Sequence, residues 1–138
     1  MKKLILLLVI TVFMTQVQAQ KLITKDVPAP TTAAFAKANP AIQNAEWSKA
    51  GNDYVAQFTS KNLPTTATYN ASGVLLKTVE IIPVTELPAS ATEYVKKNYK
   101  LEEVDEVSKM TNENNVASYL VKVKGINLTF DLMGTFIK

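Results

Sequence analysis

The chain has 138 residues and a formal net charge of +3, and it contains no histidine, cysteine or arginine. These absences exclude zinc sites built from histidine and cysteine, thiol nucleophiles and histidine-based catalytic triads. All fifteen basic residues are scattered lysines, whereas nucleic-acid-binding domains carry clustered basic residues and arginine forks. We therefore expect no nucleic-acid partner, no metal ion and no cofactor.

The first nineteen residues have the pattern of a secretory signal peptide. Lys2 and Lys3 precede an apolar run over residues 4–14, and Val17 and Ala19 place small residues before a cleavage point. The run is too short for a membrane span, which needs about 20 residues. We predict cleavage between Ala19 and Gln20, no membrane span after removal of the signal, and a periplasmic or secreted location. Loss of Lys2 and Lys3 lowers the net charge from +3 to +1.

Two similar stretches, sixty positions apart, predict amphipathic helices. The upstream stretch, residues 26–39, reads "DVPAPTTAAFAKAN", and the downstream stretch, residues 86–99, reads "ELPASATEYVKKNY". Pro28 and Pro88 suit a first helical turn, where the missing N–H costs nothing. Apolar residues then recur at helical spacing in both stretches. Pro40 is expected to end the first helix.

After each helix the apolar residues recur with a period of two, which predicts β-strands. In the first half the expected strands are residues 45–49, 54–59, 65–69 and 74–82. In the second half they begin with residues 106–110, 119–124 and 126–130. The turns at residues 70–73 and 131–134 match, because each starts with Asn or Asp and ends with glycine.

These elements predict an α+β fold made of a tandem repeat of two helix-plus-four-strand units, at about residues 26–82 and 86–138. Neither unit is large enough to bury one side of its own sheet. Joined, the two units are expected to form one antiparallel sheet of about eight strands with the helices on one face. Residues 20–138 should therefore make a single domain.

The alternation along the strands assigns each side chain to one of the two sheet faces. The core face is expected to carry the apolar members: Tyr54, Phe58, Tyr119, Val121, Leu128 and Phe130. The open face is expected to carry the polar members, which are the candidate binding residues: Gln57, Thr59, Thr66, Thr68, Lys122, Lys124, Asn127 and Thr129.

The chain resembles the exported PepSY-like proteins of Bacteroidetes-type bacteria, a family described as β-lactamase-inhibitor-like. The resemblance covers residues 26–138 and rests on the two helical stretches together with "NAEWSKAGNDYVAQF", "YNASG" and "FDLMGTFIK". It implies a tandem α+β fold, an extracytoplasmic location, no known catalysis and binding to a protein. In the β-lactamase inhibitory protein the uncovered face is concave and aromatic-rich. The expected open face here has few such anchors, which argues against β-lactamase as the target.

Two further groups of residues have alternative interpretations. The acidic residues Glu102, Glu103, Asp105 and Glu106 could ligate calcium, but they lack the spacing of a calcium loop, and a solvated charged segment is favoured. Trp47 and Tyr54 could form a stacking platform for a sugar or peptide, but aromatic residues in strands are more often core residues.

The sequence favours a non-catalytic periplasmic or secreted binding module that holds a protein or peptide of the cell envelope on its open face, with inhibition as one outcome. The alternatives are a small enzyme that uses carboxylates or lysine, and a structural envelope protein without a discrete ligand. The sequence leaves the oligomeric state open.

The signal-peptide hypothesis has a direct test. The exported protein should begin at Gln20, with or without cyclisation of that residue, because cleavage is expected after Ala19. Intact-mass measurement of the exported protein would show this, and exported material that retains Lys2 and Lys3 would contradict it.

Overall fold

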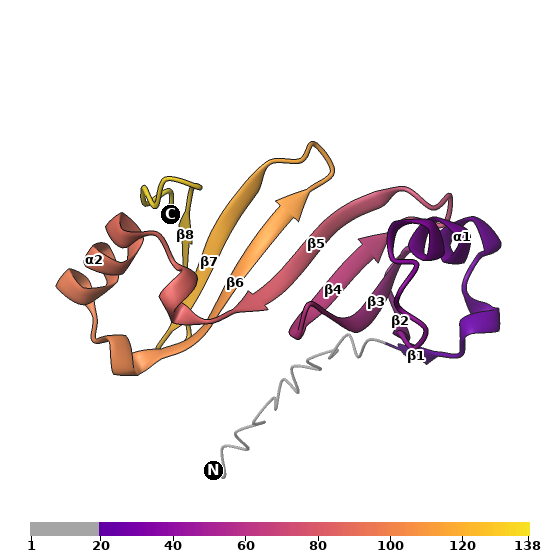
Figure 1. Cartoon of the computed structure of the whole chain (residues 1–138), viewed down its shortest axis with the longest axis horizontal. Coiled ribbons are helices and arrows are strands. Elements are labelled where there is room, and N and C mark those ends of the chain that lie inside the picture. The colour runs from indigo at the N-terminus through magenta and orange to yellow at the C-terminus, as the bar shows by residue number, and fades with distance from the viewer. Residues whose placement is uncertain (1–19) are drawn as a thin grey trace, which may run out of the picture.

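The computed structural model describes residues 20–138, which form one sheet and two helices (Figure 1). All eight strands are antiparallel and lie side by side in chain order, from β1 to β8. This confirms the predicted α+β class and the single antiparallel sheet. The predicted signal segment, residues 1–19, lies outside the described residues.

Each half of the chain contains one helix and four strands. The first half contains β1 (Gln20–Leu22), α1 (Ala29–Ala38), β2 (Glu46–Ala50), β3 (Asp53–Ser60) and β4 (Leu63–Tyr69). The second half contains β5 (Leu75–Ile82), α2 (Ala89–Asn98), β6 (Val104–Asn112), β7 (Ala117–Val123) and β8 (Ile126–Phe130). Three short 3-10 turns complete the chain: η1 (Thr24–Asp26), η2 (Val84–Glu86) and η3 (Leu101–Glu103).

Each helix starts directly after a proline and buries one narrow stripe. Pro28 and Pro88 stand at the N-caps of α1 and α2, so no helical N–H is lost there. α1 buries Thr31 and Phe35, and α2 buries the residues at the corresponding positions, Ala91 and Val95. The four-residue spacing puts each pair on one side of its helix.

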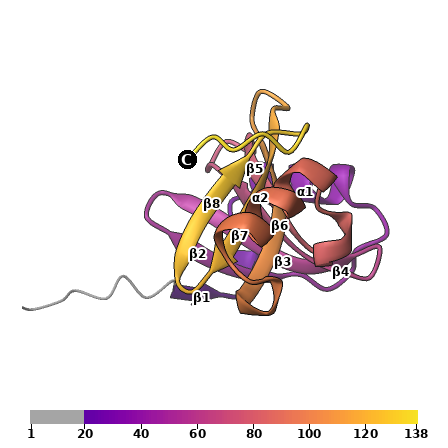
Figure 2. The ribbon, with the colours of Figure 1, turned by 90° about the vertical axis from the view of Figure 1, so that its left-hand side faces the viewer.

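The register of the sheet places both helices on the same face. Ala56 pairs with Ala67, Ala67 with Thr78 and Thr78 with Thr111. Directly paired residues point to the same side of a sheet, so the face beneath α1 on β3 continues beneath α2 on β6. The helices lie near opposite ends of the sheet (Figure 1) and on one side of it (Figure 2).

Two hydrophobic clusters lie under the helices. In the first, Phe35 makes edge-to-face contacts with Trp47, Phe58 and Tyr69, with ring centroids 5.4, 5.1 and 6.4 Å apart. The second packs α2 on β6, β7 and β8 through Val95, with Val107, Val121, Leu128 and Phe130 among its buried members. All six residues predicted for the core face belong to these clusters or pack against them.

The number of strands after each helix differs from the prediction. Four strands follow α1, but three follow α2, and the eighth strand is β1, which precedes α1. After β8 the chain forms one isolated bridge, between Phe130 and Phe136. Thr129 also exchanges backbone hydrogen bonds with Ile137 and Lys138. The expected fourth strand of the second half is therefore a short segment bonded to β8.

The pairing of β1 with β2 recurs sixty residues later in the pairing of β5 with β6. Leu22 of β1 pairs with Trp47, and Ile82 of β5 pairs with Val107, so both partners are shifted by sixty positions. The corresponding order is thus one strand, one helix and three strands in each half. This differs from the helix-first order that the sequence predicts.

Matching turns follow β4 and β8 and press a glycine against each helix. The side-chain oxygen of Asn70 accepts hydrogen bonds from the N–H groups of Ser72 and Val74. Asp131 does the same for the second turn. Gly73 has φ +84°, and a Cβ atom there would lie 2.5 Å from the carbonyl oxygen of Pro30. Gly73 therefore fixes how closely the turn approaches α1.

Substitution of this glycine should separate backbone strain from packing. Gly73→Ala should destabilise the protein by clearly more than Gly51→Ala, because Gly51 also has positive φ (+62°) but a Cβ atom added to it would have no neighbour within 4 Å. The control should lose about 1 kcal/mol, the cost of the left-handed conformation. Urea unfolding of both variants measures the difference, and equal losses would contradict the close approach to Pro30.

Candidate binding surface

The sheet face opposite the helices forms a broad surface that we call the open face. On β3 the exposed side chains of Gln57 and Thr59 point to this side, because they alternate with the core residues Ala56 and Phe58. Thr66 is paired with Gln57 and is half-buried. At the other end of the sheet Lys122 and Asn127 are paired and exposed on the same face. The structure thus places these five predicted site residues in two groups, near opposite ends of the open face.

Two predicted binding residues lie on the open face and are mostly covered, although Thr129 still lines a hollow there. Thr68 is 7 % exposed and lies between its cross-strand neighbours Val55 and Lys77. Thr129 is 9 % exposed, and the chain beyond β8 hydrogen-bonds to its backbone. A hydroxyl can look exposed from strand alternation and still be covered, because alternation does not report the size of its neighbours.

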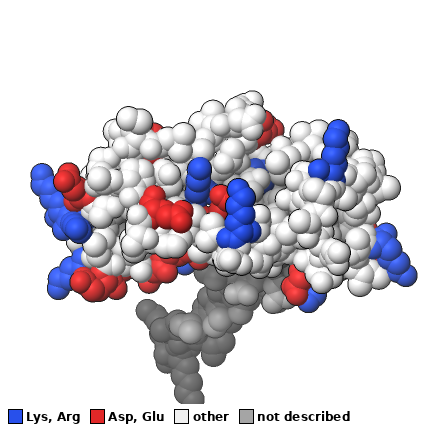
Figure 3. Space-filling view, in the orientation of Figure 1, with Lys and Arg blue, Asp and Glu red and all other residues white. Residues whose placement is uncertain are grey.

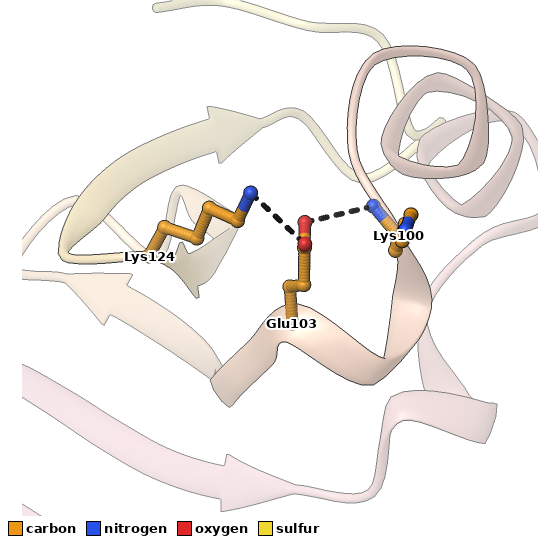
Figure 4. Close-up of polar contacts among 3 residues, drawn as sticks. All are labelled: Lys100, Glu103 and Lys124. Carbon is orange, nitrogen blue, oxygen red and sulfur yellow. Dashed lines mark hydrogen bonds and ion pairs between the residues drawn. The ribbon is translucent and has the colours of Figure 1, made fainter.

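Lys124 does not belong to the open face, which corrects the prediction. It lies in the turn between β7 and β8 with φ +49°, so the strand alternation has already ended there. Its ammonium group is 2.9 Å from Oε1 of Glu103 in η3 (Figure 4). The backbone N–H of Lys100 also donates to Glu103. This pair connects the turn to the segment between α2 and β6.

The acidic residues 102–106 do not converge on one point. Glu103 is engaged by Lys124, whereas Glu106 lies on β6 opposite Lys122 on the open face. Within residues 20–138 there is no group of three or more aspartates or glutamates arranged to hold a metal ion. The neighbouring lysines favour the interpretation of this segment as charged surface.

Trp47 and Tyr54 are core residues and do not form an exposed stacking platform. Trp47 is 4 % exposed and contacts Phe35. Tyr54 is half-buried against the same cluster, and the Lys49 ammonium lies 5.8 Å from the centre of its ring. Beside Trp47 a hollow of about 510 Å³ opens between α1 and the loop before β2, on the helix-covered side.

An apolar group at the centre of the open face was not predicted from the sequence, and we call it the central stripe: Val79, Ile81, Met110 and Leu120. Val79 is paired with Met110, and Ile81 and Leu120 flank Ser108, so the four side chains are neighbours on β5, β6 and β7. Ile81 is 37 % exposed, and the other three are half-buried. The sequence contained an indication of this group. Ile81 and Ile82 are consecutive apolar residues, so their side chains must point to opposite faces of β5.

A hollow of about 510 Å³ lies on the open face beside the central stripe. Two cross-strand rows line it: Glu106, Lys122 and Asn127 form one row, and Ser108, Leu120 and Thr129 form the other. Lys138 borders the hollow where its backbone bonds to Thr129. The hollow is therefore lined by one acid, two lysines, an amide, hydroxyls and an apolar side chain.

Charges are dispersed over the molecule. On the face drawn in Figure 3, acidic and basic side chains are interspersed and separated by wide uncharged areas. On the open face Lys21 and Glu46 form an exposed ion pair at 3.7 Å. Such a surface does not favour a strongly charged partner. In the described part of the chain, neither helix has the length and apolar character needed to cross a membrane.

Comparison with known proteins identifies the fold. The sequence matches no protein-family model and no curated protein. A DUF2874 family protein from Bacteroides ovatus is similar in structure, with a TM-score of 0.72, 20 % identity, and coverage of 80 % of this chain and 84 % of that chain. A BLIP-like protein from Bacteroides fragilis gives a TM-score of 0.70 at 22 % identity, with 80 % and 84 % covered.

A third similar structure is a Bacteroides eggerthii protein whose name provisionally assigns it to the periplasm. Its TM-score is 0.73 at 16 % identity, and the similarity covers 81 % of this chain and 86 % of that chain. The similarities support the β-lactamase-inhibitor-like part of the expected resemblance and do not extend to the PepSY-like part. The chain has the fold of these Bacteroides proteins.

The contact between Lys124 and Glu103 should be visible in the titration of Glu103. The hydrogen bond from Lys124 is the main reason why the pKa of Glu103 lies below its ordinary value of 4.5. At a pH above the ordinary pKa of 4.5, the pair of Lys124 and Glu103 therefore stabilises the folded state. This stabilisation is lost as the pH falls through the lower pKa that Glu103 has in the folded protein. Lys124→Gln should raise the pKa of Glu103 in an NMR titration, whereas Lys122→Gln should leave it unchanged. An unchanged pKa in Lys124→Gln would disprove the contact.

Proposed function

We propose that this chain is an exported, non-catalytic binding module that holds a protein or peptide partner on its open face. The observation that carries the proposal is the central stripe, Val79, Ile81, Met110 and Leu120, in the middle of a face that no helix covers. Polar residues border it at both ends, with Gln57 and Thr59 on β3 and Lys122 and Asn127 on β7 and β8. An apolar centre with a polar rim is the usual anatomy of a protein interface.

The shape of the site supports a macromolecular partner. Apart from the hollow beside Glu106 and Lys122, the open face is a twisted sheet surface, which is wide and shallow, whereas small molecules are usually enclosed by concave, largely apolar pockets. The partner contacts most compatible with this face are apolar side chains over the central stripe and hydrogen bonds to Gln57, Thr59 and Thr66. Lys122 adds one charge, and Lys124 adds none because it is bound to Glu103.

The central stripe is the stronger determinant of binding in this proposal. Lys124, a candidate binding residue from the sequence, contributes little to the open face, because it lies in a turn and is paired with Glu103. Apolar burial is less sensitive to salt than contacts between exposed charges. The complex should therefore weaken only modestly as ionic strength rises.

Chemical composition supports binding without turnover. Histidine and cysteine are missing from the sequence, so the commonest general bases and the thiol nucleophile are missing too. An enzyme based on carboxylates or lysine is the competing hypothesis. Its best residues would be Glu106 and Lys122 on the open face, which are both exposed, whereas catalytic groups are usually tuned by burial.

The location and the origin of the chain are part of the proposal. The signal pattern of residues 1–19 and the similarity to a protein provisionally assigned to the periplasm support export. The contacts repeated at a spacing of sixty residues support an origin by duplication of one strand–helix–three-strand unit. The BLIP-like fold of one similar protein makes inhibition of an envelope enzyme one form that binding could take.

A matched pair of methionine substitutions tests the proposal. Met110→Asp places a charge in the central stripe, whereas Met133→Asp makes the same change at an exposed loop residue away from the open face. Partners captured from the envelope of the native host by the wild-type protein and identified by mass spectrometry provide the ligand. Purified partner should bind Met110→Asp at least about tenfold more weakly, because a desolvated charge would face the partner.

The control should bind like the wild type, and Lys122→Glu should have a smaller effect than Met110→Asp. Melting curves of all variants must stay close to the wild type for the comparison to hold. Equal affinity of Met110→Asp and wild type would place the site elsewhere, on the edge strands or loops. A turnover that disappears with Glu106→Gln would overturn the non-catalytic assignment.

A further inference from the structure

Two oppositely charged side chains, Glu106 and Lys122, lie side by side in the open-face hollow and form no ion pair with each other. Glu106 on β6 and Lys122 on β7 are direct cross-strand partners. Opposite charges in this arrangement often form a pair. Among the described residues, however, the ion pairs are those of Lys21 with Glu46 and Lys124 with Glu103. Glu106 and Lys122 are therefore both available to a ligand.

Two hydroxyl groups also line the same hollow and make no hydrogen bond to the described residues. Ser108 is 5 % exposed and Thr129 is 9 % exposed, and both line the hollow. Neither hydroxyl donates or accepts a hydrogen bond within residues 20–138, and neither is wholly enclosed. Both hydroxyls therefore reach the solvent in the hollow, where they can hydrogen-bond to water or to a bound ligand.

We propose that this hollow binds a small zwitterion, namely a free α-amino acid or a short peptide with an apolar side chain. The α-ammonium group would pair with Glu106 and the α-carboxylate with Lys122. Ser108, Thr129 and the amide of Asn127 donate further hydrogen bonds to the carboxylate. Because the ligand carries both charges, it complements the acid and the base at once, which a simple anion or cation cannot do.

The apolar side of the hollow determines the side chain of the ligand. Leu120 lines the hollow, and Ile81 is the cross-strand neighbour of Ser108 on the other side. A branched aliphatic side chain placed there would cover both. The volume of about 510 Å³ leaves room for one amino acid or a dipeptide. Binding should be weak, because Glu106 and Lys122 are exposed and partly screened by water.

A series of leucine derivatives tests this inference in the folded protein. L-leucine has both charges, N-acetyl-L-leucine lacks the ammonium, and L-leucinamide lacks the carboxylate. In an NMR titration, L-leucine should shift the backbone amide signals of Ser108, Lys122 and Asn127 saturably. Each blocked derivative should bind about tenfold more weakly, as expected for the loss of one charge-assisted hydrogen bond. The dipeptide leucyl-leucine, included in parallel, shows whether the free amino acid or the peptide is preferred.

Two charge-removing variants assign the contacts. Glu106→Gln should abolish the preference for L-leucine over the acetylated derivative, and Lys122→Gln should abolish the preference over the amide. Met133→Asp is the control, because it adds a carboxylate at an exposed loop residue away from the lining of the hollow, and it should bind L-leucine like the wild type. The proposed function is tested with the captured partner and this inference with L-leucine, so either can fail without the other.

Equal binding of all three derivatives, or signal changes spread over the whole protein, would overturn the inference. Preferences that persist in both Glu106→Gln and Lys122→Gln would also overturn it, because the charges of the ligand would then be recognised elsewhere.

Discussion

Strand β5 is the constraint on which the arrangement of the molecule depends. It pairs with β4 on one side and with β6 on the other, and so joins the two hydrophobic clusters in one register. A shift of one residue in that register would turn every following side chain to the opposite face. With the observed register, α1 and α2 must cover the same side. The other side is left to solvent or to a partner, and this is why the molecule has an open face at all.

The same strand explains the chemistry of the open face. A strand covered on one side usually alternates apolar and polar residues, but β5 carries Val79 and Ile81 on the uncovered side and Ile82 in the core. Met110 and Leu120 extend this apolar area across β6 and β7. Exposed apolar side chains that lie together, with polar residues around them, are a feature of surfaces that bind other molecules. The adjoining hollow, with Glu106 and Lys122 unpaired, adds a polar site beside the apolar one.

Much of the fold could be predicted because the helix starts, the buried helix faces and the turns are each specified by residues close together in the sequence. Pro28 and Pro88 mark the helix starts, and helical spacing identified the buried faces that Phe35 and Val95 occupy. Asn70 and Gly73, with their counterparts Asp131 and Gly134, identified the two matching turns. Strand β1 was missed because three residues are too few to show a period, and because it adjoins the predicted signal segment.

The sequence by itself determined the α+β class, the helix positions, the core face of the strands and the lack of histidine and cysteine chemistry. Only the tertiary structure decided which of the side chains that alternation assigns to the open face a partner could contact. Lys124 is paired with Glu103, and Thr68 is covered by its cross-strand neighbours Val55 and Lys77. The physical reason is that alternation assigns a side chain to a face of its own strand. Whether that side chain is covered, paired or free depends on residues brought beside it by the register of the whole sheet.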